Sequence, residues 1–204
     1  MVSNWPLETK KGMNNKLFKA FFGVEPKSVR GTVVISPIIY PKQFEAEFGE
    51  KGNHYKSVLS YLVANFKNLT FIKTPMTQSA VHDLIVLLKG SKCKNIIFIG
   101  AIGGIAKGLK IGDVVLPDKA KEICSLKSIH DETRTNMVVL RKKGVIGIDF
   151  EAQSFYKAAR KVNIFAGSAF IVTDLPLTKP FYQTKTQKER EKIKKAVKFI
   201  VHSI

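Results

Sequence analysis

The order of apolar and polar positions changes character several times along the chain. Continuous β-branched and apolar runs at residues 32–35, 69–72 and 95–99 predict buried strands. Between the last two, apolar residues spaced three or four apart over 77–89 predict a helix. Strand, helix and strand within about thirty residues are typical of a βαβ unit with parallel strands and a right-handed crossover. We therefore predict an α/β fold.

The same two patterns extend over the rest of the chain. Apolar runs predict strands at 113–116, 144–148 and 164–173, and helical spacing predicts helices at 13–22, 53–66, 151–160 and 193–204. Residues 118–143 show no clear pattern beyond a short strand at 137–140. No internal repeat or low-complexity linker is present, so we expect a single domain over 1–204, with 1–30 as an N-terminal arm.

The basic, amphipathic helix of this arm has two interpretations. Leu17, Phe18, Phe21 and Phe22 lie among Lys16 and Lys19, and Gly23 ends the pattern. We expect the apolar side to dock on the main body. The alternative is a helix that lies on a membrane surface.

Composition limits the class of protein. A 45% hydrophobic and 25% charged content is that of an ordinary globular chain, and no apolar stretch reaches the roughly 20 residues of a membrane-spanning helix. The polar N-terminus lacks the apolar centre of a secretory signal. Two cysteines, Cys93 and Cys124, exclude a disulfide framework and an all-thiolate zinc site. We expect free thiols, a cytoplasmic location and no membrane span.

Charge is the unusual feature of the composition. The sequence has 34 Lys and Arg against 16 Asp and Glu, a formal net charge of +18. Such an excess attracts nucleic acid, an anionic membrane surface or phosphorylated small molecules, but it also serves solubility alone. Polyanion binding is therefore one open interpretation, and a solvated basic surface is the other.

The sequence argues against a resident metal or nucleotide cofactor. Its four histidines are widely scattered, and neither His-x-x-Glu-His nor paired Cys-x-x-Cys spacing occurs. Leu109 stands where a phosphate-binding loop starting at Gly103 would need its lysine. The glycines at 100, 103 and 104 do not fit the dinucleotide fingerprint either. We expect no metal and no cofactor.

The glycines and two acids nevertheless predict a ligand site. Gly100, Gly103 and Gly104 follow the strand at 95–99 and predict a turn at its carboxyl end, where ligands bind in open α/β sheets. Asp174 and Glu151 follow two other predicted strands, so both should reach the same crevice. The alternatives are a turn that only packs, a Glu151 that complements the helix dipole and an Asp174 that caps a turn.

Three segments in order carry a family resemblance. Residues 100–117 (GAIGGIAKGLKIGDVVLP) resemble the Gly-rich turn and Lys-x-Gly-Asp-x-Val strand of the nucleoside phosphorylase and nucleosidase superfamily. Residues 147–153 (GIDFEAQ) resemble its Glu-Met-Glu segment, and residues 172–176 (VTDLP) its Ser-Asp segment. The chain thus looks like a shortened, divergent relative of purine nucleoside phosphorylase, uridine phosphorylase and methylthioadenosine nucleosidase. The resemblance implies three layers, with a central mixed, largely parallel sheet flanked by helices, and a homo-oligomer.

The resemblance also implies an activity and residue roles. It implies cleavage of the N-glycosidic bond of a nucleoside, which we expect to be a purine nucleoside. The cleavage would proceed by hydrolysis, or by phosphorolysis with phosphate as co-substrate. Asp174 would be the general acid at N7 of the base, Glu151 would accept hydrogen bonds from the ribose hydroxyls, and Phe150 would pack against the sugar. The other substrate-binding positions implied are Gly100, Ala101, Gly103, Gly104 and Thr173.

Departures from the family pattern leave the nucleophile open. Phosphorolytic relatives hold phosphate with arginines and a Ser or Thr, where this chain has Phe98, Ala101 and residues 38–40. Hydrolytic relatives activate water with a glutamate after the first strand, which is absent here. The candidates for replacement are Glu45 or Glu47 as base, Lys42, Arg134 or Arg141 as phosphate ligands, and His54 acting across a subunit interface. The alternative function is a catalytically degenerate protein that binds a nucleoside or nucleotide.

Overall fold

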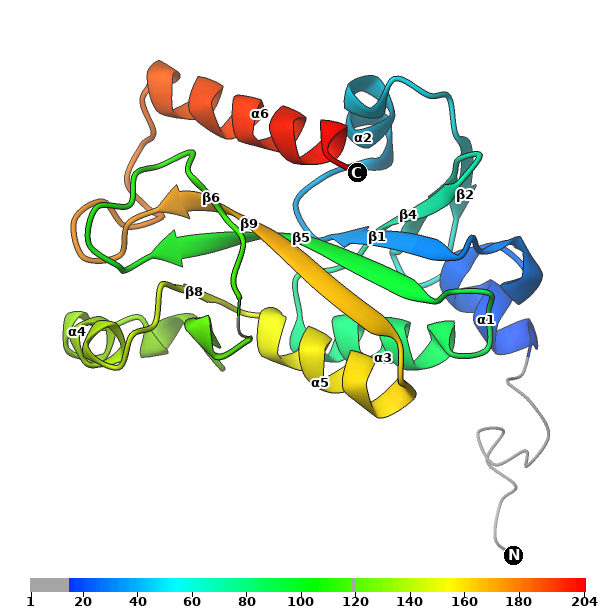
Figure 1. The fold of residues 1–204 in the computed structure, drawn as a ribbon, viewed down its shortest axis with the longest axis horizontal. Helices are drawn as coiled ribbons and strands as arrows, with labels where there is room; N and C mark the ends of the chain where they lie inside the picture. The colour runs from blue at the N-terminus through cyan, green and yellow to red at the C-terminus, as the bar shows by residue number, and fades with distance from the viewer. Residues whose placement is uncertain (1–14, 119) are drawn as a thin grey trace, which may run out of the picture.

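Apolar runs of the sequence form the strands of one mixed sheet in the computed structural model, which describes residues 15–118 and 120–204 (Figure 1). Residues 1–14 of the predicted arm lie outside the described residues. The middle of the sheet consists of β4 (Leu69–Lys73), β1 (Thr32–Ser36), β5 (Asn95–Gly104) and β9 (Phe165–Asp174), side by side and parallel. The predicted strands at 32–35, 69–72 and 164–173 are therefore confirmed.

Shorter strands extend this parallel centre at both edges. A hairpin of β2 (Asn53–Lys56) and β3 (Leu62–Asn65) pairs antiparallel with β4. On the other side β6 (Val114–Val115) runs antiparallel to β9. A second branch leaves the carboxyl end of β5, where β8 (Gly147–Asp149) pairs with it and then with β7 (Ile123–Ser125). At Gly103, β5 therefore has a partner strand on each side, β8 and β9.

Helices cover both faces of the sheet, which gives the predicted three-layer α/β fold. Figure 1 shows α2 (Pro41–Phe48) and α6 (Gln187–His202) on one face, and α3 (Gln78–Leu88), α4 (Arg134–Lys142) and α5 (Ala152–Val162) on the other. The period of two along β1 explains how both faces are filled, since neighbouring side chains of a strand point to opposite faces. Val33 and Ile35 belong to the core beneath α3 and α5, and Val34 to the core beneath α2 and α6.

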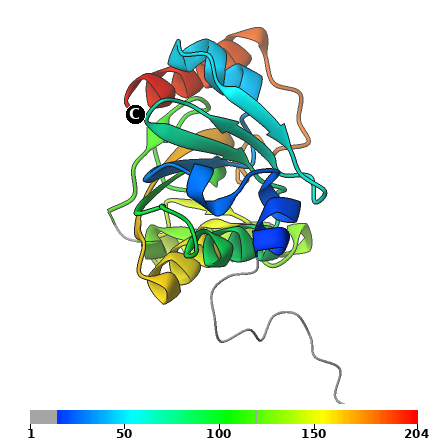
Figure 2. The same cartoon turned by 90° about the vertical axis from the view of Figure 1, so that its right-hand side faces the viewer.

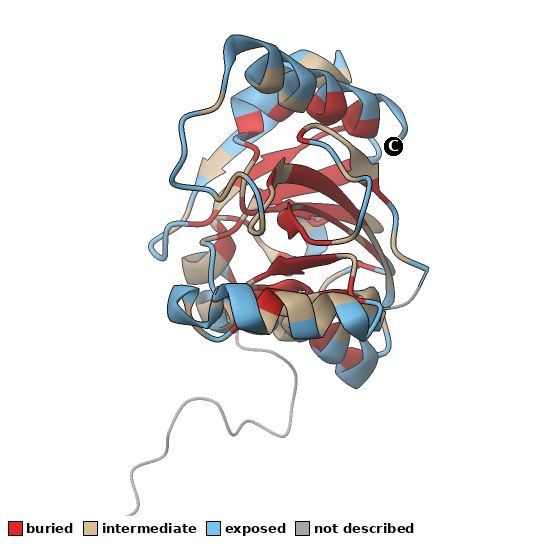
Figure 3. Cartoon of the chain, turned by 90° about the vertical axis from the view of Figure 1, so that its left-hand side faces the viewer, coloured by how far each residue is buried: buried red, intermediate tan, exposed pale blue. Residues whose placement is uncertain are grey.

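The buried surface follows the same division. Figure 3 shows the buried residues concentrated in the sheet and on the inward sides of the helices. Among the described residues, no helix is long and apolar enough to cross a membrane. Cys93 and Cys124 are both free thiols, as expected.

The described part of the arm packs on the body. Helix α1 (Asn15–Phe22) buries Phe18 and Phe22 completely, and the Phe22 ring lies 5.8 Å from the Tyr61 ring. The Val58 amide of the hairpin loop donates a 3.0 Å hydrogen bond to the Ala20 carbonyl at the side where α1 meets the hairpin (Figure 2). The apolar side of α1 packs against the core of the protein, so this side is not available to bind a membrane.

The helix predicted at 53–66 was wrong, because this segment is the β2–β3 hairpin. Val63 and Ala64 are both buried, one in the core of each face, so the interior strand β3 has an apolar run that imitates a buried helix. Val58 is 81% exposed at the tip, where a helix would have buried it. Ser60 adopts a left-handed φ of 63°, which a regular helix does not permit.

Two helices, α4 and α2, were not predicted from the sequence. Residues 137–140, predicted as a strand, lie inside α4, whose first turn is capped by Thr133: its hydroxyl accepts a 3.2 Å hydrogen bond from the Asn136 amide. Helix α2 was not predicted, although Pro41 at its start and Gly49 at its end, with a left-handed φ of 76°, are ordinary boundary signals.

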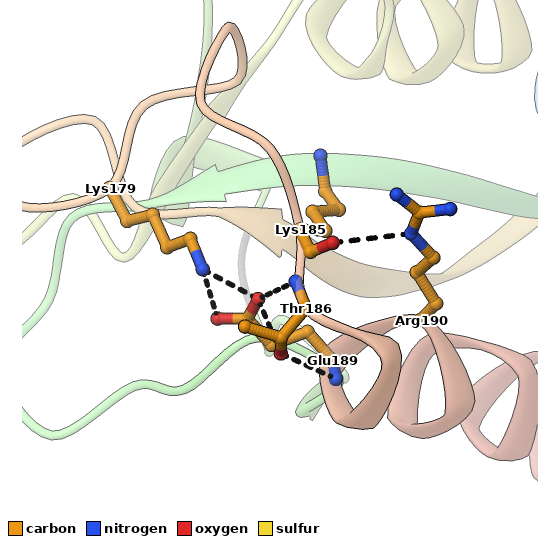
Figure 4. Close-up of polar contacts among 5 residues, drawn as sticks. All are labelled: Lys179, Lys185, Thr186, Glu189 and Arg190. Atoms are coloured by element: carbon orange, nitrogen blue, oxygen red, sulfur yellow. Dashed lines mark hydrogen bonds and ion pairs between the residues drawn. The ribbon is translucent and has the colours of Figure 1, made fainter.

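Helix α6 begins with a pair of reciprocal hydrogen bonds (Figure 4). The Thr186 hydroxyl accepts from the Glu189 amide at 3.2 Å, and the Glu189 carboxylate accepts from the Thr186 amide at 2.7 Å. We expect Thr186→Ala to lower the free energy of unfolding by about 1 kcal/mol, because the Glu189 amide loses the hydroxyl that accepts its hydrogen bond. Urea denaturation measures the change. Thr184→Ala, at an exposed position just before the cap, should leave the midpoint unchanged; equal losses would contradict the capping role.

Candidate active site

The carboxyl end of β5 brings together two acids that are far apart in the sequence. Gly103 pairs with Asp174 of β9 on one side and with Ile148 of β8 on the other. Glu151 follows Ile148 by three residues and stands directly before α5. The pairing of three strands at Gly103 therefore directs both carboxyl groups to one place.

A cavity of about 550 Å³ lies at this place, and its lining is mostly apolar. Six of the eight predicted site residues line it, and Gly100 and Gly104 do not. The predicted residues that line the cavity are Ala101, Gly103, Phe150, Glu151, Thr173 and Asp174. The cavity therefore joins the two acids with the position predicted to contact the sugar.

The turn predicted at residues 100–104 was wrong, because these residues continue β5 as an extended strand. Their glycines are explained by close packing rather than by a turn conformation. A Cβ at Gly100 would lie 2.6 Å from the Phe98 ring, and one at Gly104 would lie 3.0 Å from Val172 Cγ1. A Cβ at Gly103 would lie 2.8 Å from Pro176 Cγ, 3.1 Å from Ile148 Cγ1 and 3.2 Å from Asp174 Oδ2. The glycine at 103 therefore allows close packing and also leaves room for the Asp174 carboxylate.

Asp174 is buried at the end of β9, with only 7% of its surface exposed. Burial raises the pKa of its carboxyl group, while a hydrogen bond from Thr173 and the charge of Lys185 act in the opposite direction. The Thr173 hydroxyl donates to Asp174 Oδ1 at 3.1 Å. A buried carboxyl with a raised pKa is suited to hold a proton nearer neutrality than an exposed one.

Glu151 is 5% exposed, and its Oε1 has no hydrogen-bond partner among the described residues. It occupies the residue before α5 without capping that helix. Asp149 does so instead, since its carboxylate accepts 2.7 Å and 2.6 Å hydrogen bonds from the Ala152 amide and the Ser125 hydroxyl. An unpaired buried carboxylate oxygen is costly, so Glu151 Oε1 is available for a donor on a ligand.

Burial raises the pKa of Glu151 to about 7, and the charge of Asp149 adds to the effect. Because folding raises this pKa, protonation favours the folded state. That contribution is fully present below the unfolded value near 4.5 and is lost as the pH rises through 7. At about pH 8, Glu151→Gln should therefore raise the free energy of unfolding by up to roughly 3 kcal/mol, with little change at about pH 4.

Urea denaturation at the two pH values measures this difference. Glu191→Gln, at an exposed position on α6, removes the same charge without touching the cavity and serves as the control. A Glu151→Gln variant that is less stable than the parent at the higher pH would show that the carboxylate has a partner in the folded protein.

The structure adds cavity residues that the sequence analysis missed. Glu132 lines the same cavity from the segment before α4, and burial raises the pKa of its carboxyl group to about 7, with the charge of Asp174 as the second cause. Phe181 and Ile129 contribute apolar surface. Asp149 lies inside the motif that carries Glu151, so the sequence could have indicated it as a site residue. No sequence signal indicated Glu132.

The candidates for phosphate binding do not line the cavity. None of its described lining residues is Lys, Arg or His. Lys42 is exposed on α2, Arg141 lines a separate cavity beside Ala106, and Arg134 donates to the Leu177 carbonyl at 3.5 Å. In the part of the chain that the structure describes, no group of three His, Cys, Asp or Glu residues is arranged to hold a metal ion.

The candidates for activating water are also placed elsewhere. Glu45 forms an ion pair with His54 of the edge hairpin, and neither residue lines the cavity. Glu47 lies on α2 and is likewise absent from the lining. The loop after β1 does not bring these residues back to the acids, and it contributes Pro37 and Ile38 instead.

Comparison with known proteins agrees with this fold. Residues 37–122 match the family model described as the phosphorylase superfamily, a stretch that contains the first of the three motifs. No curated protein matches the chain in sequence. An AMP nucleosidase from Bacteroides thetaiotaomicron superposes with a TM-score of 0.67 at 14% identity, over 92% of this chain and 95% of that one.

Uridine phosphorylase from Vibrio fischeri is similar to the same degree. In complex with 6-hydroxy-1-naphthoic acid it gives a TM-score of 0.71 at 14% identity, over 85% of this chain and 88% of that one. A second structure of it gives 0.70 at 13% identity, over 85% and 89%. The resemblance to the nucleoside phosphorylase and nucleosidase superfamily is therefore confirmed, in sequence over residues 37–122 and in fold over most of the chain.

Proposed function

We propose that this protein cleaves the N-glycosidic bond of a purine nucleoside in the cavity between β5, β8 and β9. One observation carries the proposal: two buried carboxyl groups, Asp174 and Glu151, line a single apolar cavity, and one oxygen of Glu151 has no protein partner among the described residues. The match of residues 37–122 to the phosphorylase superfamily model supports glycosidic-bond cleavage in general. The choice of a purine base and the roles of the individual residues are part of our proposal.

Glu151 holds the sugar in this proposal. The 2′- and 3′-hydroxyls of a ribose donate to its two carboxylate oxygens, which satisfies the unpaired Oε1. Phe150, beside it in the lining, packs against the apolar side of the sugar ring. As the bond breaks, the sugar gains oxocarbenium character, and a carboxylate held close to it stabilises that positive charge.

Asp174 supplies the proton. The electron pair of the breaking C1′–N9 bond moves into the purine, and Asp174 protonates N7 so that the base leaves neutral. Water adds its oxygen to C1′ and releases a proton to solvent, which balances the reaction. Burial, which raises the pKa of Asp174, favours the protonated form that this step needs.

Water is the nucleophile that the lining supports better. Phosphate carries negative charge and is normally held by cationic side chains, of which the described lining has none. The similar structures include a nucleosidase and a phosphorylase, so they are consistent with either water or phosphate as the nucleophile.

A panel of purine and pyrimidine nucleosides, incubated with and without phosphate, tests the proposal by chromatography of the free base. We expect purine release that does not depend on phosphate. Product that forms only with phosphate would contradict hydrolysis. Calorimetric binding of a nucleoside with no base released over hours would instead establish the degenerate binding protein, for which the displaced Glu45 and the missing cations are the supporting observations.

A further inference from the structure

We infer that the solvent face of α6 is a binding surface for single-stranded nucleic acid. This face carries six exposed basic residues, one exposed aromatic residue and one acid, and it lies in the layer opposite α3 and α5 (Figure 1). The inference does not depend on the proposed catalytic activity. The basic residues of this face are Lys188, Arg190, Lys192, Lys194, Lys195 and Lys198.

The basic residues form rows along the helix. Arg190, Lys194 and Lys198 follow one another at intervals of four, so each lies about 6 Å further along the axis on nearly the same side. All six side chains are exposed, and within the described part of the chain none of them forms an ion pair with an acid. Regularly spaced, unneutralised cations suit the repeated phosphates of a nucleic acid strand.

Neither acid of the described helix α6 forms an ion pair with a residue of these rows. Glu189 is bound by Lys179, whose Nζ lies 2.8 Å and 2.6 Å from its two carboxylate oxygens, and by the Thr186 cap (Figure 4). Glu191 is the single acid on the basic face, and it accepts a 3.1 Å hydrogen bond from Gln187. Arg190 is oriented by its own bond from Nε to the Lys185 carbonyl, at 3.2 Å.

A neighbouring loop extends the same charge. Gly112 lies directly against Lys192, since a Cβ at this glycine would be 2.4 Å from Lys192 Cβ. The loop before it carries Lys107 and Lys110, both exposed. The segment between β5 and β6 that packs on α6 at Lys192 therefore adds two exposed lysines, together with Asp113, near the helix.

Phe199 distinguishes a single strand from other polyanions. Its side chain is 62% exposed on α6, one turn after Lys195, where an unpaired base can stack on it. A membrane would need an apolar helix face, but that face of α6 is in the core through Val197, Ile200 and Val201. Duplex DNA keeps its bases stacked inside and gains nothing from one exposed ring.

Fluorescence anisotropy of a labelled twenty-nucleotide oligothymidylate against salt, from about 50 to 200 mM, tests the inference. Six phosphate contacts predict a slope of log affinity against log salt of about −4. The double variant Lys194→Gln/Lys198→Gln should reduce the magnitude of this slope by roughly 1.4. Phe199→Ala should weaken binding about tenfold with little change in slope.

The matched control removes the same charge from the opposite layer. Lys157 and Lys161 are also exposed lysines four residues apart, on α5, and Lys157→Gln/Lys161→Gln should leave the slope and affinity nearly unchanged. Equal losses in the two double variants would overturn the inference, because binding would then follow net charge alone. No binding at the lowest salt, or tighter binding of duplex DNA or of anionic phosphatidylserine vesicles than of the single strand, would also overturn it.

Discussion

Asp174→Asn is expected to lower kcat for base release by about 10² to 10⁴, the usual contribution of a general acid. Asparagine keeps the size of the side chain but has no acidic proton to give to the leaving base. Substrate affinity should change little, because the step that is lost belongs to the transition state. Single-turnover base release and calorimetric binding of the same nucleoside measure the two effects.

Asp83→Asn provides the matched control, since this aspartate is 58% exposed by its side chain on α3 and lies outside the cavity. It should turn over at the parent rate. Unchanged turnover in Asp174→Asn would remove Asp174 from the mechanism, whatever the fold of the variant.

The pH dependence follows from the same assignment. Burial holds the pKa of Asp174 above its ordinary range. An acid catalyst must be protonated, so kcat should fall as the pH rises through that raised pKa, while protonation of the Glu151 carboxylate produces a separate limb on the acid side. In Asp174→Asn this high-pH limb should be absent from the residual activity.

Glu151→Gln is expected to lower kcat/KM for a ribonucleoside by about a hundredfold. The amide of glutamine has one acceptor oxygen and one donor nitrogen, so it cannot accept from both ribose hydroxyls, and it brings no charge to the developing oxocarbenium ion. The loss corresponds to ~3 kcal/mol, the size of one or two hydrogen bonds to a charged group.

A comparison of ribonucleosides with 2′-deoxyribonucleosides checks this role more closely. The parent should prefer the ribonucleoside, and Glu151→Gln should lose most of that preference, because the variant and the substrate change remove the same interaction. If the variant keeps the full preference of the parent, Glu151 does not contact the 2′-hydroxyl. The same variant gains stability at high pH, as argued above, so its loss of activity would not reflect unfolding.

The two acids of the site were predictable because both follow apolar runs typical of buried strands. The apolar runs at 164–173 and 144–148 are distinctive. In an open α/β sheet, the residue that follows a strand lies at the carboxyl edge of the sheet, where ligands bind. Helix α5 had an equally clear amphipathic pattern. These elements alone predict that Asp174 and Glu151 lie at the same edge of the sheet.

Other features depend on contacts that a single sequence does not display. Gly100 and Gly104 are glycines because aromatic and aliphatic side chains press on them, and a cluster of glycines has the same letters whether it packs or turns. The strand β3 imitated a helix because both of its faces are covered. Glu132 directly follows a short helical turn at residues 129–131 that has no buried residue, so no apolar periodicity could reveal it.

A crystal structure of the protein with a non-cleavable purine nucleoside analogue would show whether Glu151 and Asp174 enclose one ligand. We expect one analogue in the cavity beside Gly103, with both ribose hydroxyls within hydrogen-bond distance of Glu151 and the N7 edge of the base facing Asp174. An analogue bound elsewhere, or bound with its sugar away from Glu151, would rule out the proposed roles of both acids.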